Sequence, residues 1–224
     1  MKNNNKTSIA IVDKYHYENL LFKEGYTHIA GVDEVGRGPL AGPVVACAVI
    51  LPRDYKNEDL NDSKKLSAKK REELYDIILR DALDVGIGIV SHQVVDQINI
   101  YQASKVAMCK ALENLKNVPD HVLIDAVPLY DKYPKSTPLI KGDTLSSSIM
   151  AASIVAKVTR DRIMDEMAVK YPNYGFEKHK GYPTKYHLEM LEKYGPCPIH
   201  RMTYKPLNKN NYMQLSLDLG LDEE

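Results

Sequence analysis

The sequence has 224 residues and a mass of 25.3 kDa, with 44% apolar and 27% charged residues, which is sufficient for one sizeable hydrophobic core. Thirty Lys and Arg residues balance thirty Asp and Glu residues, which excludes a uniformly basic nucleic-acid coat but allows a local basic face. The longest apolar run, Val44 to Leu51, has eight residues, whereas a membrane-spanning helix needs about 20. We therefore expect a soluble monomer without a membrane partner.

The N-terminal residues and the cysteines indicate the compartment. The start, Met1 to Lys6, is polar, and the apolar stretch Ile9 to Val12 is too short for a signal-peptide core of about 7–15 residues. The three cysteines lie far apart without a CxxC pair, which favours reduced thiols over disulfides or a zinc site. We therefore expect a cytoplasmic protein that performs no redox chemistry.

In chain order, apolar runs alternate with helical patterns. Strands rich in β-branched and apolar residues are predicted at 29–35, 44–51, 85–90, 121–125 and 139–141. Helices are predicted from the cap Ser67 to about Leu83, from Tyr101 to Leu115, and from Asp143 to about Lys170. This alternation indicates a layered α/β core.

The composition changes near Tyr171. We assign residues 1–170 to a catalytic core with a helical lead-in at 1–25, residues 171–211 to a helical, substrate-binding extension, and residues 212–224 to a flexible acidic tail. The extension contains seven basic and three acidic residues with tyrosines between them, a composition that suits a phosphate backbone. A solvated helical extension with tyrosines packed inside remains an alternative.

Four acidic residues stand at the ends of predicted elements. Acids in an apolar strand are costly unless cations or hydrogen bonds neutralise them. Adjacent strand residues point to opposite faces, so a neighbouring pair can share a site only where the strand ends or bulges. The four residues are Asp33 and Glu34 before the Gly36-Arg37-Gly38 segment, Asp125 at a strand end, and Asp143 at an expected helix start.

Oxygen-only ligands favour the hard divalent ions Mg²⁺ or Mn²⁺. Two such ions about 4 Å apart can stabilise both the attacking and the leaving oxygen during phosphodiester hydrolysis. Duller explanations stay open: Asp143 as a helix cap, Asp125 as a turn former, and the Asp33 and Glu34 pair as a solvated strand terminus.

Two other function classes compete with hydrolysis. Gly36, Gly38 and Gly42 partly match a dinucleotide-binding fingerprint, but that fingerprint must open a helix. Here Pro39 and Pro43 interrupt the segment and a predicted strand follows, so the helix N-terminus that would hold a pyrophosphate is missing. A noncatalytic module that binds nucleic acid is suggested by the basic and aromatic composition of the extension.

Seven ordered motifs resemble those of bacterial ribonuclease HII, over about residues 26 to 205. They are GVDEVGRGPLAGPVV from Gly31, DSKKLS from Asp62, INIYQAS from Ile98, LIDAV from Leu123, KGD from Lys141, AASIVAKVTRD from Ala151 and HKGYPTKYH from His179. The fold that this resemblance implies is a ribonuclease H-like mixed five-stranded sheet flanked by helices, with a helical C-terminal extension.

The resemblance also implies an activity. Asp33, Glu34, Asp125 and Asp143 match the family's catalytic residues, which hold two Mg²⁺ or Mn²⁺ ions. The enzyme is expected to cleave the RNA strand of RNA/DNA hybrids and to cut 5′ of ribonucleotides embedded in duplex DNA, leaving 3′-hydroxyl and 5′-phosphate ends. It would serve to remove misincorporated ribonucleotides and RNA primers.

Substrate contacts follow from the same resemblance. Gly36, Arg37 and Gly38 match a loop whose backbone approaches the 2′-hydroxyl, the group that distinguishes RNA from DNA. Tyr182 matches a tyrosine that packs on the following deoxyribose. Two further residues, Lys64 and Asn99, match positions associated with substrate contact; a solvated lysine and a helix-capping asparagine are the alternatives.

The tail carries a separate motif. Gln214-Leu215-Ser216-Leu217-Asp218-Leu219 resembles the short bacterial motif that docks into the replication sliding clamp, with Gln214, Leu215, Leu217 and Leu219 as its contacts, although an aromatic end is missing. A frayed acidic terminus is the alternative.

Four further residues complete the expectations. His179, His187 and His200 lack the spacing of metal ligands and are expected to form hydrogen bonds or caps. Arg160 is expected to pair with its neighbour Asp161 at the surface of the long helix.

Overall fold

The computed structural model describes residues 13–208 of the chain. Five strands form one mixed sheet in the order β3-β2-β1-β4-β5. Their bounds are β1 (Ile29–Val35), β2 (Val44–Ile50), β3 (Asp84–Val90), β4 (His121–Asp125) and β5 (Ser136–Leu139). Strands β1, β2 and β3 pair antiparallel, whereas β4 pairs parallel with both β1 and β5. The expected mixed five-stranded sheet is confirmed.

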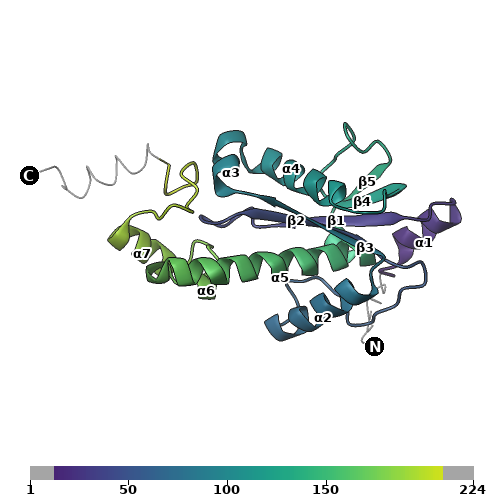
Figure 1. Cartoon of the computed structure of the whole chain (residues 1–224), viewed down its shortest axis with the longest axis horizontal. Helices are drawn as coiled ribbons and strands as arrows, with labels where there is room; N and C mark the ends of the chain where they lie inside the picture. The colour runs from purple at the N-terminus through teal and green to yellow at the C-terminus, as the bar shows by residue number, and fades with distance from the viewer. Residues whose placement is uncertain (1–12, 209–224) are drawn as a thin grey trace, which may run out of the picture.

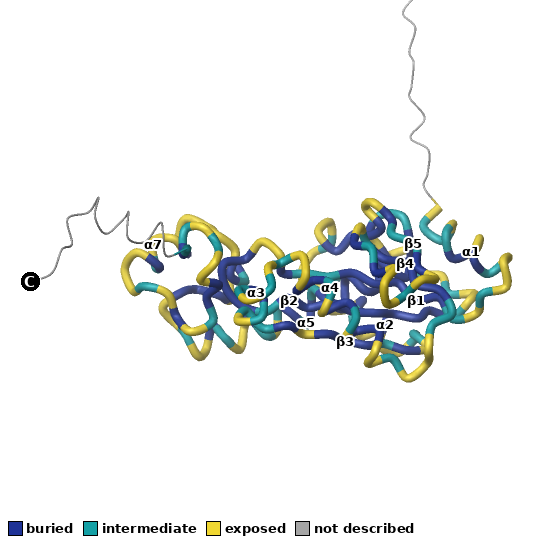
Figure 2. Tube along the Cα trace, turned by 90° about the horizontal axis from the view of Figure 1, so that it is seen from above, coloured by how far each residue is buried: buried dark blue, intermediate teal, exposed yellow. Residues whose placement is uncertain are grey.

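Helices cover both faces of this sheet (Figure 1). Helices α3 (His92–Ile98) and α4 (Ile100–Glu113) lie over one face, and α5 (Ser147–Lys170) lies along the other with α2 (Ala68–Asp81) packed outside it. Because both faces are covered, every residue of β2 is buried, and Figure 2 shows the sheet strands and much of α5 as buried. Two apolar layers result, one on each side of the sheet.

A glycine lets α5 approach β1 closely. A Cβ atom on Gly31 would lie 2.1 Å from the backbone carbonyl carbon of Ser148, so any larger residue would push the helix away. The start of α5 therefore rests directly on the strand that carries Asp33 and Glu34.

The expected start of the long helix is wrong. Asp143 lies in a separate 3₁₀ turn, η1 (Gly142–Thr144), and α5 begins at Ser147 with Ser146 as its cap. Lys141 has a left-handed backbone with φ of 60°, which ends the extended chain and shifts the predicted strand from 139–141 to β5. Helix α3 was not predicted.

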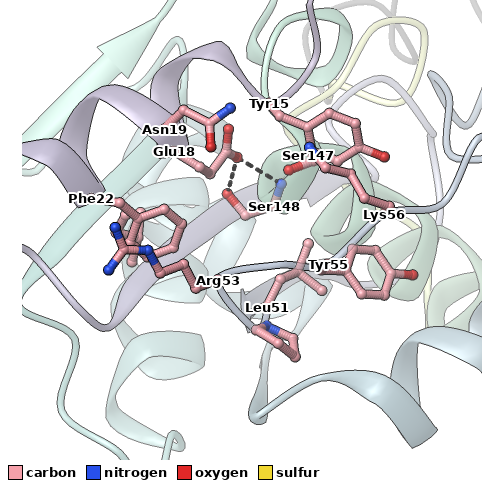
Figure 3. Close-up of a pocket in the computed structure, with 12 residues that line it drawn as sticks. Tyr15, Glu18, Asn19, Phe22, Leu51, Arg53, Tyr55, Lys56, Ser147 and Ser148 are labelled. Atoms are coloured by element: carbon pink, nitrogen blue, oxygen red, sulfur yellow. Dashed lines mark hydrogen bonds between the residues drawn. The ribbon is translucent and has the colours of Figure 1, made fainter.

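Helix α1 (His16–Lys23) is fixed to the start of α5 by one buried acid. Glu18 Oε1 accepts hydrogen bonds from the Ser148 N–H (2.9 Å), the Ser148 Oγ (2.6 Å) and the Ser146 Oγ (2.6 Å). Figure 3 shows Glu18 pointing at Ser148 across a small pocket that contains none of the four predicted catalytic acids. Glu18 thus satisfies N–H and hydroxyl groups at the helix N-terminus.

The C-terminal region is helical, as expected, and packs against the far end of α5 (Figure 1). It comprises η2 (Pro172–Tyr174), α6 (Phe176–His179) and α7 (Lys185–Tyr194). Phe176, Leu191 and Leu207 pack with Leu40 and Met164 in a small core of their own. The proposed clamp motif lies outside the described residues. No helix within residues 13–208 is long and apolar enough to cross a membrane.

Candidate active site

The four predicted acids converge at one edge of the sheet. Val32 of β1 pairs with Ile124 of β4, so the next residues, Asp33 and Asp125, stand side by side where β4 ends, two residues before the end of β1. The Gly142 N–H donates to Asp125 Oδ1 (2.7 Å), which places the η1 turn and Asp143 beside them. Glu34 completes the group: its charge raises the pKa of Asp33, and the charge of Asp125 raises the pKa of Glu34.

Burial and mutual repulsion disfavour the charged form of three of these acids. Burial raises the pKa of Asp33 well above its usual range, and the nearby Glu34 and Asp125 raise it further. Burial also raises the pKa of Glu34 to about 7 despite the opposing charge of Arg37. The pKa of Asp125 is raised mainly by burial, with Asp143 adding to it. The protein groups around these three acids therefore stabilise the charged forms poorly.

Each acid has a partner within the protein. Asp33 Oδ1 accepts the Glu34 N–H (2.7 Å), Asp143 Oδ2 accepts the Lys64 ammonium (2.9 Å), and Glu34 Oε1 lies 3.4 Å from the Arg37 guanidinium. With these side-chain orientations, no three His, Cys, Asp or Glu residues in the part of the chain that the structure describes are grouped to hold an ion.

The chemistry of the donors nevertheless fits a hard divalent cation. Glu34 Oε2 is buried and has no hydrogen-bond partner among residues 13–208, and such an oxygen is costly without a cation or donor. The donors are all carboxylate oxygens, which Mg²⁺ and Mn²⁺ prefer. The competing cation on Asp143 is Lys64, whose side chain is 77% exposed, so the ammonium group can be released into solvent.

Ser153 is a member of this site that sequence analysis did not single out. Its hydroxyl hydrogen-bonds Asp33 and lowers the pKa of that carboxyl, opposing the effect of burial. It also lies 2.9 Å from the hydroxyl of Ser63. The polar serine within the small, apolar stretch of the long helix was the signal in the sequence.

The Gly-Arg-Gly loop is held from behind by a buried arginine. Arg201 is fully buried and donates to the carbonyls of Gly36 (2.7 Å) and Arg37 (3.1 Å). In a trans peptide the carbonyl and the following N–H point in opposite directions, so the N–H groups of Arg37 and Gly38 point away from Arg201. Gly36 has φ of +100°, and a Cβ there would lie 2.4 Å from Arg160 Nε, so only glycine fits.

The expected surface pair of Arg160 and Asp161 is wrong. Arg160 is fully buried and donates to three carbonyls, those of Pro43 (2.9 Å), Lys180 (3.0 Å) and Ala41 (3.1 Å). Asp161 instead pairs with Lys157 (2.5 Å). Arg160 lies on the face of α5 that is packed inside the protein, and backbone carbonyls there satisfy its donors.

Tyr182 lies directly beside the loop. A Cβ on Gly38 would be 3.5 Å from the Tyr182 ring, and the Leu40 N–H donates to the Gly181 carbonyl (2.8 Å). The tyrosine is 40% exposed, so its ring is accessible. The loop and Tyr182 therefore form one continuous surface next to the acids.

Asn99 takes a different place. It is the N-cap of α4, where its side chain accepts the Gln102 N–H (3.1 Å), so the capping alternative is confirmed and substrate contact stays a prediction. The expectation that His179, His187 and His200 form hydrogen bonds is also confirmed.

The order of the elements decides against a dinucleotide enzyme. The glycine-rich loop leads into the antiparallel strand β2, not into the helix that would bind a pyrophosphate.

The sequence profile of ribonuclease HII matches residues 30–207. The chain belongs to the ribonuclease HII family. It is 55% identical over 205 residues to the ribonuclease HII of Listeria innocua, covering 91% of this chain and 78% of that protein. It is 58% identical over 191 residues to that of Bacillus cytotoxicus, covering 85% and 73%. Enzymes of this family are endonucleases that act on RNA in RNA/DNA hybrids, so a noncatalytic module is not supported.

Two solved structures share the fold. The ribonuclease H2 of Pyrococcus horikoshii aligns with a TM-score of 0.70 and 27% identity, over 83% of this chain and 97% of that one. A ribonuclease HII from Archaeoglobus fulgidus, solved in complex with PCNA, aligns with a TM-score of 0.67 and 26% identity, over 80% and 95%. Both likenesses support the mixed five-stranded sheet flanked by helices.

Proposed function

We propose that this enzyme hydrolyses the RNA strand of RNA/DNA hybrids and also cuts 5′ of single ribonucleotides embedded in duplex DNA, leaving 3′-hydroxyl and 5′-phosphate ends. The observation that carries the proposal is the convergence of four acids beside a surface formed by the Gly-Arg-Gly loop and Tyr182. Such an enzyme would remove misincorporated ribonucleotides and RNA primers.

The acids would hold two Mg²⁺ or Mn²⁺ ions. Asp33, Glu34, Asp125 and Asp143 offer only oxygen donors, and the unpartnered Glu34 oxygen and the raised pKa values favour a nearby cation. When bound, two such ions supply the positive charge that stabilises the attacking and leaving oxygens. Lys64, freed from Asp143, would contribute its ammonium group to a substrate phosphate.

The loop and Tyr182 would select the position of the cut. The N–H groups of Arg37 and Gly38, directed away from Arg201, suit the 2′-hydroxyl of the ribonucleotide. The exposed ring of Tyr182 next to Gly38 suits the apolar face of the next deoxyribose, where an additional hydroxyl would clash. Together these groups would recognise a step from RNA to DNA.

The test uses a DNA duplex with one ribonucleotide and an all-DNA duplex of the same sequence. We expect Mg²⁺-dependent cutting of the first only, and loss of cutting in Asp125→Asn with the fold preserved. The matched control is Asp131→Asn, since that acid is 97% exposed in its side chain. Cutting that survives EDTA, or an Asp125→Asn enzyme as active as the wild type, would contradict the proposal.

We also propose that the tail motif at Gln214, Leu215, Leu217 and Leu219 binds the bacterial sliding clamp. The support is the tail's sequence together with the archaeal relative that was solved with PCNA. A chain ending at Asn211 should lose binding to the clamp and keep its cutting of free duplex. Equal clamp binding by the full and shortened chains would refute this assignment.

A further inference from the structure

Three buried histidines lie behind Tyr182 in the C-terminal region. His187 Nε2 is 3.0 Å from His200 Nε2, and His187 Nδ1 is 2.9 Å from the Tyr182 carbonyl. His179 stacks on His187 with ring centroids 4.5 Å apart. His187 and His200 are almost completely buried, and nothing in the catalytic chemistry proposed above uses them.

One placement of the protons satisfies every donor in this group. His200 Nδ1 lies 2.9 Å from the Cys197 N–H, which can only donate, and 3.2 Å from the Cys197 carbonyl, which already accepts the His200 N–H (3.0 Å). With Nδ1 as the acceptor of the shorter contact, the His200 proton is on Nε2. His200 Nε2–H then donates to His187 Nε2, which places the His187 proton on Nδ1. This last N–H donates to the Tyr182 carbonyl. The result is a one-way chain of hydrogen bonds from Cys197 through two neutral rings to Tyr182.

A charged ring would break this chain. A charged His187 would place its Nε2–H against the His200 Nε2–H, and a charged His200 would place its Nδ1–H against the Cys197 N–H. The titratable groups that act on the pair favour neutrality as well. They are His179 from α6 and His92 from α3, and both lower the pKa of the ring that they face. Burial and these neighbours lower the pKa of both His187 and His200 to about 4.

The backbone of Tyr182 is held on both sides. Its N–H donates to the His179 carbonyl (2.9 Å), and its carbonyl accepts the Thr184 N–H (2.8 Å) in addition to His187. Its ring is the part that reaches Gly38. The direction of the ring therefore depends on a peptide group that the histidine chain fixes from inside the protein.

We propose that His187 and His200 are positioning residues that orient Tyr182 through this hydrogen-bond chain and thereby set the preference for a deoxyribonucleotide after the cut. The inference rests on the proposed role of Tyr182 in recognising that sugar. Neither histidine touches the substrate; both act through the Tyr182 carbonyl.

The proton placement can be measured without substrate. In the full-length protein labelled with ¹⁵N-histidine, imidazole nitrogen shifts at pH 7 should show the proton on Nδ1 of His187 and on Nε2 of His200, with both rings neutral. The Tyr182 carbonyl should then perturb only the His187 Nδ1–H signal. The opposite tautomers, or a charged ring, would overturn the hydrogen-bond chain whatever the activity.

The effect on specificity is tested with matched variants. His200→Gln keeps a donor near the Nε2 position, His200→Leu removes it, and His92→Gln alters a nearby histidine outside the chain. For each we would compare kcat/KM on a duplex with one ribonucleotide against kcat/KM on a hybrid whose cut strand is all RNA. His200→Leu should lower this ratio about tenfold, as expected for one lost buried hydrogen bond, while the other two keep it.

Circular dichroism and unfolding midpoints check that each variant is folded. If His200→Leu does not fold, it is replaced by His187→Leu. The rescue variant is then His187→Asn, which retains a donor near the Nδ1 position. An unchanged ratio in a folded His200→Leu or His187→Leu enzyme would overturn the positioning role. A wild-type ratio that does not change in Tyr182→Ala would instead refute the proposed role of Tyr182, while the tautomer measurement still decides the hydrogen-bond chain.

Discussion

Substitution of Arg160 tests whether buried cations hold the substrate-binding surface together. The guanidinium donates to three carbonyls, of Pro43, Ala41 and Lys180, and bonds from a charged donor contribute about 2 kcal/mol each, or about 6 kcal/mol together. Burial lowers the pKa of Arg160 from 12.5 to about 10, which corresponds to about 3 kcal/mol of cost for the charged form. Arg160→Met should therefore destabilise the protein by about 3 kcal/mol.

The assay is urea unfolding followed by circular dichroism, with Arg162→Met as the control two residues away on the same helix. Arg162 pairs with Glu72 at the surface, with both side chains 49% exposed, so its loss should cost less than about 1 kcal/mol. Arg160→Lys should recover only part of the stability, because an ammonium group cannot replace a planar fork directed at three separate carbonyls. An Arg160→Met protein as stable as the Arg162→Met control would refute this account of the loop.

Three further outcomes follow. Gly31→Ala should cost at least about 3 kcal/mol in unfolding free energy, since its Cβ would lie 2.1 Å from the Ser148 backbone; a near-normal urea midpoint would contradict the close packing. Saturating Mg²⁺ should raise the melting temperature of the wild type more than that of Asp125→Asn, and equal shifts would place the ion elsewhere. Burial lowers the pKa values of His187 and His200 to about 4, so below about pH 6.5 these histidines bind protons in the unfolded chain but not in the folded protein. The free energy of unfolding should therefore fall between pH 6.5 and pH 4, and it should fall less steeply in His200→Leu. Equal slopes in the two proteins would argue against neutral buried rings.

Local signals in the sequence were sufficient for most of the fold. Ser67 before an amphipathic stretch predicted the start of α2, and its hydroxyl accepts the Lys70 N–H as a cap should. The start of α5 was misplaced because Asp143 and Ser146 are both good capping residues. The choice between them involves Glu18, which binds Ser146 and Ser148 from 128 and 130 positions away. No local pattern shows such a contact.

The short helix α3 was missed for a different reason. Val94, Val95 and Ile98 pack against the core, but the helix has only seven residues, fewer than the roughly 11 over which a helical period can be recognised. Its place is fixed from outside: Asp96 accepts the N–H groups of Met202 and Thr203, which tie it to the C-terminal region.

The acids of the site were visible because charge within an apolar strand is unusual enough to require an explanation. The buried positions of Arg160 and Arg201 could not be predicted from the sequence, because the partners of both side chains are backbone carbonyls, which every residue supplies. One signal was present: Arg160 continues the four-residue spacing of the buried Ala152, Ala156 and Met164. A charged residue within such a buried stripe must find hydrogen-bond partners inside the protein. Arg160 is therefore better interpreted as a buried hydrogen-bond donor than as half of a surface ion pair.

The hydrogen bonds from Arg160 and Arg201 to backbone carbonyls also determine how the acids and Tyr182 are placed relative to each other. Three of the acids lie on β1 and β4 of the sheet and Asp143 lies in the adjoining η1 turn, whereas Tyr182 belongs to the C-terminal region. A defined distance between the acids and Tyr182 therefore depends on what joins the two parts. Arg160 links the Ala41 and Pro43 carbonyls to Lys180, two residues before the tyrosine, and Arg201 fixes the Gly36 and Arg37 carbonyls. Because these bonds use only backbone oxygens, they leave the Arg37 side chain, 45% exposed, and the outward N–H groups available to the nucleic acid. The same contacts thus stabilise the loop and present its binding groups.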